Sequence, residues 1–175
     1  KAGKIRARDH YRGCGKFDAI LICVPTPLRK TKDPDISYIV SAVDQIAREV
    51  RPGQVIVLES TTYPGTTEDL VRPLLENGSD PPLRCGEDFF LAFSPEREDP
   101  GNRDFGTTNT PKVVGGVDPV SGDLAEALYG AIVDKVVRVS TAGTAEAAKL
   151  TENIFRAVNI ALVNELKVVF ERMGI

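Results

Sequence analysis

A carboxylate and an arginine follow an apolar run in the stretch FFLAFSPEREDPG, residues 89–101. Glu96 and Arg97 come directly after a proline, so they stand where the apolar run has just ended. Carboxylates do acid–base chemistry in proteins when a rigid element holds them within hydrogen-bond reach of the reacting group. We therefore ask which other polar groups the chain brings to this segment, and which elements position them.

Two other apolar runs end in a similar way. DAILICV (18–24) runs into Pro25-Thr26-Pro27, and QVIVL (54–58) runs into Glu59-Ser60-Thr61-Thr62. Any one of these ends can be explained by the tendency of Ser, Thr and Pro to terminate strands. Three apolar runs that each end in hydroxyl or carboxylate side chains together favour a ligand-binding edge, because open parallel sheets bind ligands at the carboxyl ends of their strands.

A second group of polar residues lies near the C-terminal end of the sequence. Lys149, Asn153 and Arg156 are spaced i, i+4 and i+7, which places them in one stripe on a helix. The positions around them are strongly apolar: Leu150, Ile154, Val158, Ile160, Ala161 and Leu162. This pattern predicts a mostly buried helix whose Lys and Arg line a cleft, where they can meet phosphate or oxyanion groups. The alternative is an ordinary solvated face.

The elements that must position these residues alternate along the chain. Continuous apolar runs predict buried strands, and apolar residues three and four apart predict helices. The predicted strands are 18–24, 54–58, 88–93, 112–116 and 136–139. The predicted helices are 37–50, 66–75, 119–130 and 145–173. Strands that alternate with helices predict an α/β fold with right-handed βαβ units in a parallel sheet.

The last predicted helix differs from the others in length. It covers roughly 30 residues without an internal Gly or Pro, which is longer than most helices of globular domains. It is typical of the first helix of another domain. We therefore expect one domain over 1–140 and the start of a second over 141–175.

Composition excludes several classes of function. The chain has 175 residues, 42% of them hydrophobic and 27% charged, as in ordinary globular domains. The net charge of −3 gives no basic footprint for nucleic acid, and no apolar run approaches the ~18 residues of a membrane span.

Three cysteines, Cys14, Cys23 and Cys85, form no disulfide framework, so we expect a cytoplasmic protein. Cys23 is predicted to be a small core residue, because it lies within an apolar run. His10 is the only histidine, and one histidine with scattered cysteines makes no metal site.

Five segments together resemble the NAD-dependent UDP-sugar 6-dehydrogenases of the UDP-glucose/GDP-mannose dehydrogenase family. They are ICVPTPL (22–28), ESTTYPGTTE (59–68), FSPEREDPGN (93–102), PKVVGG (111–116) and AAKLTENIFRAVNIALVNELK (147–167). The SPEREDPGN form is most similar to the branch that acts on UDP-N-acetylhexosamines, especially UDP-N-acetylglucosamine. The resemblance implies a Rossmann domain, a long central helix and a UDP-binding domain. It also implies two oxidations of a sugar C6 alcohol by NAD⁺, through a cysteine thiohemiacetal and a thioester.

The same resemblance assigns roles to residues. It implies an NAD site lined by Val24, Pro25, Thr26, Ser60 and Thr61. It implies a substrate site that includes Glu96, Arg97, Lys149 and Asn153, and the helical stripe adds Arg156. In these sets Thr61 would hold the hydrolytic water and Glu96 would activate or position it. Lys149 and Asn153, which match the family's KxxxN pair, would bind the C6 oxygen and stabilise the tetrahedral oxyanion of thioester hydrolysis.

The sequence also departs from the family. Pro100 stands four residues beyond Glu96, where members acting on UDP-glucose have a second glutamate, and the nearest acids are Glu98 and Asp99. We found no N-terminal GxGxxG loop, no ribose-binding acid after it, no Gly-rich cysteine segment and no UDP domain. We therefore expect an internal fragment, namely the second half of a Rossmann-like sheet and the first central helix. Such a fragment should expose the edge of the strand at 18–24 and be inactive alone.

Two other functions remain open at this point. A β-hydroxyacid dehydrogenase also joins a Rossmann domain to helices that carry a Lys and an Asn four residues apart, but it has no counterpart of SPEREDPGN. The chain could also be a non-catalytic nucleotide-binding or dimerisation module. In either case we expect a homodimer or higher homo-oligomer formed through the long helix.

Overall fold

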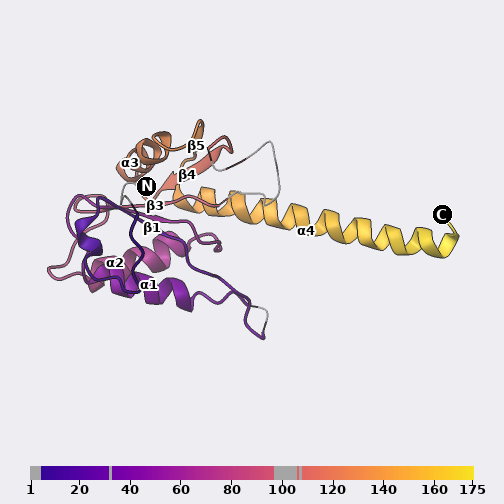
Figure 1. Ribbon diagram of the computed structural model, residues 1–175, viewed down its shortest axis with the longest axis horizontal. Helices are drawn as coiled ribbons and strands as arrows, with labels where there is room; N and C mark the ends of the chain where they lie inside the picture. Colours follow the sequence, from indigo (N-terminus) through magenta and orange to yellow (C-terminus); the bar gives the residue numbers. More distant parts are fainter. Residues whose placement is uncertain (1–4, 32, 97–105, 107) are drawn as a thin grey trace.

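A five-stranded sheet with helices on both faces forms the body of the protein (Figure 1). The computed structural model describes residues 5–31, 33–96, 106 and 108–175. The strands are β1 (Ala19–Ile22), β2 (Val55–Leu58), β3 (Phe90–Phe93), β4 (Lys112–Gly116) and β5 (Val136–Arg138). The helical elements are η1 (Cys14–Lys16), α1 (Ser37–Ala47), the π-helical turn η2 (Thr66–Val71), α2 (Arg72–Gly78), α3 (Pro119–Gly130) and α4 (Ala142–Met173). The predicted α/β fold is confirmed.

Alternate residues of the central strands face two separate apolar cores. In β2, Ile56 and Leu58 pack into the core under α1 and α2, while Val57 packs into the core under α3. β3 repeats this alternation, with Leu91 on the first face and Ala92 on the second. Because successive side chains of a strand point to opposite faces, a strand covered on both sides must be apolar throughout. This explains the continuous apolar runs.

The sheet is mainly parallel, as predicted, and one pair of strands departs from that prediction. The order is β1-β2-β3-β4-β5, and the β1/β2, β2/β3 and β4/β5 pairs are parallel. β3 and β4 are antiparallel, through the pairs Ala92↔Gly116 and Phe93↔Gly115. A parallel neighbour needs a crossover, which is usually a helix. The sequence between β3 and β4 contains Pro95, Pro100 and Pro111 and has no helical spacing, which favours the antiparallel direction over a helical crossover.

Two glycines of β4 allow helices to approach the sheet closely. A Cβ on Gly115 would lie 2.1 Å from the carbonyl oxygen of Thr141, which directly precedes α4. A Cβ on Gly116 would lie 2.2 Å from the amide nitrogen of Gly122 in α3. Both obstacles are backbone atoms, so only glycine fits at either position.

The strand at 19–22 lies at one edge of the sheet, as predicted. In the described part of the chain the strand order begins with β1, which pairs only with β2. Leu21 is 43% exposed on this strand, whereas the neighbouring Ile22 is buried.

The long helix α4 is confirmed, but the prediction that it is mostly buried is wrong. It has 32 residues, about 48 Å at the usual rise, and it projects away from the body of the protein (Figure 1). Its buried residues are Ala142, Ala145 and Glu146, and every residue from Ile154 onward is exposed. Apolar residues of α4 form a wide face, as the sequence pattern indicates, but no other described element of this chain covers that face. None of the helices in the described ranges is long and apolar enough to cross a membrane.

Candidate active site

The three loops after β1, β2 and β3 share one edge of the sheet. The last residues of these strands, Ile22, Leu58 and Phe93, are paired across the ladder and so end at the same level. Because the strands are parallel, residues 23–27, 59–65 and 94–96 leave the sheet in the same direction. Doubly wound sheets bind ligands at this edge.

The hydroxyl of Ser60 joins the first two loops. It accepts a hydrogen bond from the amide of Val24 at 2.8 Å, and it lies 2.8 Å from the Val24 carbonyl, to which it donates. Ser60 is buried. Its only donor and one of its acceptor positions are therefore used by the backbone of the neighbouring loop, so Ser60 shapes this edge.

Pro25, Thr26 and Thr61, which were predicted to line an NAD site, are among the residues of these loops that reach the surface. Pro25 and Thr61 are exposed, and Thr26 is partly exposed. The neutral hydroxyls of Thr26 and Thr61 fit the ribose and carboxamide groups of NAD, which are uncharged. A pyrophosphate instead needs free backbone amides at a helix start. The first amides of η2 do not meet that need, because they are bonded within the protein as described next.

Glu146 of α4 is bonded to the loop after β2. Its Oε2 accepts from the amide of Gly65 at 2.7 Å, and its Oε1 accepts from the amide and the hydroxyl of Thr67 at 2.9 and 2.6 Å. The Thr62 hydroxyl lies 3.5 Å from the same oxygen. Burial raises the pKa of Glu146, while the hydrogen bonds from Thr67, Gly65 and Thr62 oppose this shift. The carboxylate thus occupies the start of η2, where a helix attracts negative charge.

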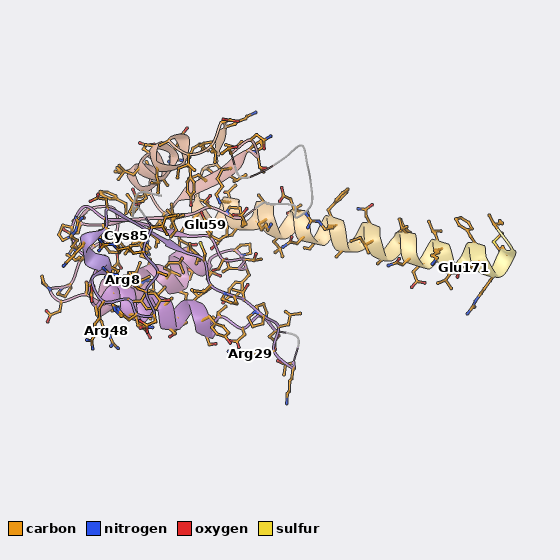
Figure 2. The ribbon with its side chains drawn as sticks, viewed as in Figure 1. Arg8, Arg29, Arg48, Glu59, Cys85 and Glu171 are labelled. Atoms are coloured by element: carbon orange, nitrogen blue, oxygen red, sulfur yellow. The ribbon has the colours of Figure 1, made fainter. Side chains whose placement is uncertain are left out.

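A second charged cluster lies at the end of β2. The ammonium of Lys112 is 3.2 Å from Oε1 of Glu59, and both side chains are only 11% exposed. The hydroxyl of Tyr129 donates to Glu59, and the Lys112 ammonium lies 5.0 Å from the centre of the Tyr129 ring. Burial and the bond to Glu59 raise the pKa of Tyr129, so its hydroxyl stays protonated and remains a donor. Figure 2 places Glu59 where α4 leaves the body of the protein, with Glu171 far out on the helix.

Cys23 belongs to this cluster and not to the core, so the prediction for this residue is wrong. β1 ends at Ile22, and Cys23 is exposed in the loop beyond it. Its thiol donates to Oε2 of Glu59 at 3.5 Å. Partial desolvation of the sulfur and the neighbouring Glu59 carboxylate raise the pKa of Cys23 to about 11.

Glu96 and Lys149, predicted from separate motifs, meet in the structure. The ammonium of Lys149 donates to the backbone carbonyl of Glu96 at 2.5 Å. Oε2 of Glu96 lies 3.7 Å from the Lys112 ammonium, and the Glu96 side chain is 55% exposed. Asn153 is one turn further along α4 and partly exposed, and Arg156 is exposed beyond it. Arg97, like Glu98 and Asp99, lies outside the described residues.

This arrangement gathers acid–base and charge-stabilising groups at one place. The base of α4 brings an ammonium to the loop after β3, whose carboxylate remains accessible to water. An exposed carboxylate can accept a proton from water, and an ammonium close to it can stabilise an oxyanion. The loops after β1 and β2 add a polar, uncharged surface beside them.

Glu59, Lys112 and Glu146 were not predicted as site residues, and their signals in the sequence are weak. Glu59 follows a buried strand without any intervening residue, and Lys112 begins one, which is unusual for charged side chains. Glu146 stands between alanines in the first turns of a long helix. A charge beside a buried segment needs a partner, but its identity depends on contacts between residues far apart in the sequence.

Two parts of one protein family match the chain. Residues 1–133 match the NAD binding domain of the UDP-glucose/GDP-mannose dehydrogenase family. Residues 143–175 match the central domain of the same family.

Individual relatives agree with these matches. The chain is 40% identical to a UDP-N-acetyl-D-glucosamine 6-dehydrogenase of Pseudomonas aeruginosa over 161 residues, which are 91% of this chain and 38% of the relative. A solved UDP-D-ManNAc dehydrogenase of Pyrococcus horikoshii superposes with a TM-score of 0.82 at 40% identity, over 90% of this chain and 37% of that one. The chain therefore spans well under half the length of these relatives.

A 3-hydroxyisobutyrate dehydrogenase of Mycobacterium tuberculosis is also similar in structure. It superposes with a TM-score of 0.63 over 91% of this chain and 47% of its own, but only 20% of the residues are identical. This likeness shows a shared fold alone.

Proposed function

The chain belongs to the UDP-glucose/GDP-mannose dehydrogenase family, and we propose that it supplies part of the active site of an NAD-dependent UDP-N-acetylhexosamine 6-dehydrogenase. Its NAD-binding part would cover 1–140, and the central domain would begin at 141. The remaining parts of the site would come from sequence outside these 175 residues, because the chain matches only 38% of its Pseudomonas relative. The names of this relative and of the Pyrococcus structure support a UDP-N-acetylhexosamine as the substrate, either UDP-N-acetylglucosamine or UDP-N-acetylmannosamine.

The contact between Lys149 and Glu96 is the observation that carries the proposal. It unites the long helix with the strand end at the edge where the NAD-binding loops also meet. When bound, NAD⁺ would accept hydride from C6 in each oxidation. Pro25, Thr26 and Thr61 would bind it through the edge described above, with Ser60 and Val24 holding the two loops together.

The second half of the reaction is hydrolysis of a thioester. Glu96 would take a proton from water, held by Thr61, as the water oxygen bonds to the acyl carbon. Lys149 and Asn153 would stabilise the tetrahedral oxyanion, which then collapses as the carbon–sulfur bond breaks and the thiolate leaves. Arg156, about 10 Å further along the helix than Lys149, would meet the diphosphate with Arg97.

The nucleophilic thiol would come from outside this chain. Cys14 is buried, and the pKa of Cys23 is raised to about 11. Burial raises the pKa of Cys85 to about 12, and the negative charge of the nearby Asp118 adds to this shift. Thiolates are the reactive form, so all three are poor nucleophiles near neutral pH. Because none of them is paired, a reducing compartment such as the cytoplasm suits the protein.

The exposed apolar face of α4 supports a homo-oligomer formed through this helix. Phe155, Val158 and Val163 are each at least 60% exposed, on a helix that continues for several turns beyond the body of the protein. A second copy would present the same face, so two helices could cover each other in a self-complementary contact. Light scattering of the purified protein should give at least twice the mass of one chain. A monomer at micromolar concentration would contradict this part of the proposal.

The catalytic proposal is tested by Lys149→Ala in the full-length enzyme that contains this chain. Loss of a charged oxyanion partner should lower kcat about 100-fold in an assay of NADH formation with UDP-N-acetylglucosamine. Lys167→Ala is the matched control, because Lys167 lies on the same helix, exposed and paired with Glu171. Glu96→Gln should accumulate an acyl-enzyme, visible as added mass on the nucleophilic cysteine. Turnover at the wild-type rate in either site variant would contradict the assigned roles.

A further inference from the structure

Glu146 is a fully buried acid to which the proposed reaction gives no role. Its relative exposure is 0%, and it accepts hydrogen bonds from Gly65 and Thr67 of the loop after β2. Burying an ionisable side chain has a desolvation cost, and an apolar residue of similar volume is often as stable in its place. Packing alone therefore does not account for an acid at this position.

On the loop side, the carboxylate fixes the start of a helix. Gly65 directly precedes η2, and Thr67 is the second residue of that turn. The first amides of a helix have no partner within the helix, so a carboxylate from another element satisfies them and sets the direction of the turn. This loop also carries Thr61, four residues before Gly65, on the cofactor side of the candidate site.

On the helix side, the same turn of α4 reaches the other loop of the site. Lys149 is three residues beyond Glu146, about 4.5 Å along the helix axis, and it donates to the carbonyl of Glu96. The other buried residues of this helical segment, Ala142 and Ala145, contribute methyl groups without directional bonds. Within one turn, α4 is thus hydrogen-bonded to the loop after β2 and to the loop after β3.

We propose that Glu146 is a positioning residue that holds Thr61 on the cofactor side and Lys149 on the substrate side in one fixed relation. The inference rests on the proposed function, because it requires that these two residues act on the same reacting centre. Misplacing a reacting group by about 1 Å can cost about 100-fold in rate. A carboxylate carried by α4, three residues before Lys149, and hydrogen-bonded to the loop that carries Thr61 prevents that displacement.

The structural half is tested on this chain by amide hydrogen exchange in Glu146→Gln. The substitution preserves shape, but its amide nitrogen cannot accept a hydrogen bond, so at least one of the Gly65 and Thr67 donors loses its partner. We expect the amides of Gly65 and Thr67, and those of residues 146–149, to exchange about 10-fold faster together. Glu165→Gln, the same chemical change at an exposed position of α4, should alter neither set. Faster exchange in the loop alone would make Glu146 a local cap and overturn the proposal.

The functional half is tested in the full-length enzyme. Loss of positioning should raise KM for NAD and lower kcat together, each by about 10-fold. If Glu146 only stabilised the fold, Glu146→Gln would reduce the amount of active enzyme and leave KM unchanged, which would overturn the proposal. If the wild-type enzyme formed no NADH with any UDP-sugar, the proposed function would fail instead. The exchange experiment would then still decide whether Glu146 couples the two elements.

Discussion

Gly115→Ala offers a direct test of how the sheet positions the long helix. The added Cβ would lie 2.1 Å from the Thr141 carbonyl oxygen, 2.6 Å from its carbon and 3.0 Å from the Ala142 nitrogen, whereas ordinary contacts begin at 3.4 Å. The oxygen must therefore move by more than 1 Å. All three obstacles are backbone atoms at the start of α4, so no side-chain rotation relieves them.

The expected loss of stability follows from two contributions. Overpacking a close contact typically costs ~1–3 kcal/mol. Thr141 also caps α4, since its hydroxyl accepts from the Thr144 amide at 3.1 Å, and disturbing such a cap costs ~1 kcal/mol. We therefore expect Gly115→Ala to lower the free energy of unfolding by about 2–4 kcal/mol, a shift of about 1–2 M in the urea midpoint.

Gly143→Ala is the matched control for this experiment. Gly143 lies in the first turn of α4, and the nearest atom to an added Cβ is the Thr141 hydroxyl oxygen at an ordinary 3.8 Å. Because alanine favours a helix over glycine by up to ~1 kcal/mol, this variant should be neutral or slightly more stable. Equal urea midpoints for the two variants would refute the view that β4 approaches α4 closely enough to require glycine.

The remaining predictions concern the charged clusters. Lys112→Met should destabilise the protein by about 3 kcal/mol in urea unfolding because it leaves the nearly buried Glu59 carboxylate without its cation, and Glu59→Gln in the same chain should restore part of that loss. Because the pKa of Glu146 is raised, the folded state binds the proton of this carboxyl group more tightly than the unfolded state does. The resulting contribution to the free energy of unfolding should be full below pH 4.5 and decline as the pH rises through the folded-state pKa. Glu146→Gln should therefore flatten that part of the stability–pH curve. Cys23 should react with iodoacetamide at pH 8 about 100-fold more slowly than an ordinary thiol, as measured by intact mass, because its pKa is raised to about 11.

The order and type of the elements could be predicted because local pattern and burial agree in this fold. Ile56, Val57 and Leu58 are all fully buried, two toward one core and one toward the other, so β2 had to appear as a continuous apolar run. Thr141 caps the start of α4, and Gly174, with φ +74°, ends it, so both ends of the helix are marked by residue types in the sequence.

The features that could not be predicted depend on what lies next to an element. The pattern of β4 predicts a strand but not its direction, which is antiparallel to β3. The hydropathy of α4 indicates a face that avoids water, but it does not say whether this chain covers that face. Ile154 and Phe155 are 54% and 70% exposed for that reason.

The candidate site was predictable in its motif residues and not in its polar network. Glu96 and Lys149 were each placed beside a strand end or on a helix by local pattern, and the structure brings them into contact. Glu59 meets Lys112 and Tyr129 across 53 and 70 positions of sequence. A contact over that distance depends on sheet order, so no short pattern in a single sequence reveals it.

The position of each polar residue along α4 determines which half of the site one chain can set by itself. Glu146 and Lys149 lie within the turns that this chain's own loops hold through hydrogen bonds. Arg156 lies on the part of the helix from Ile154 onward, where every residue is exposed. In the proposed site, contacts within one chain would therefore fix the oxyanion side. The orientation of Arg156 toward a diphosphate would depend instead on whatever covers the outer turns of the helix. Association of α4 with a second copy would then be part of completing the substrate site.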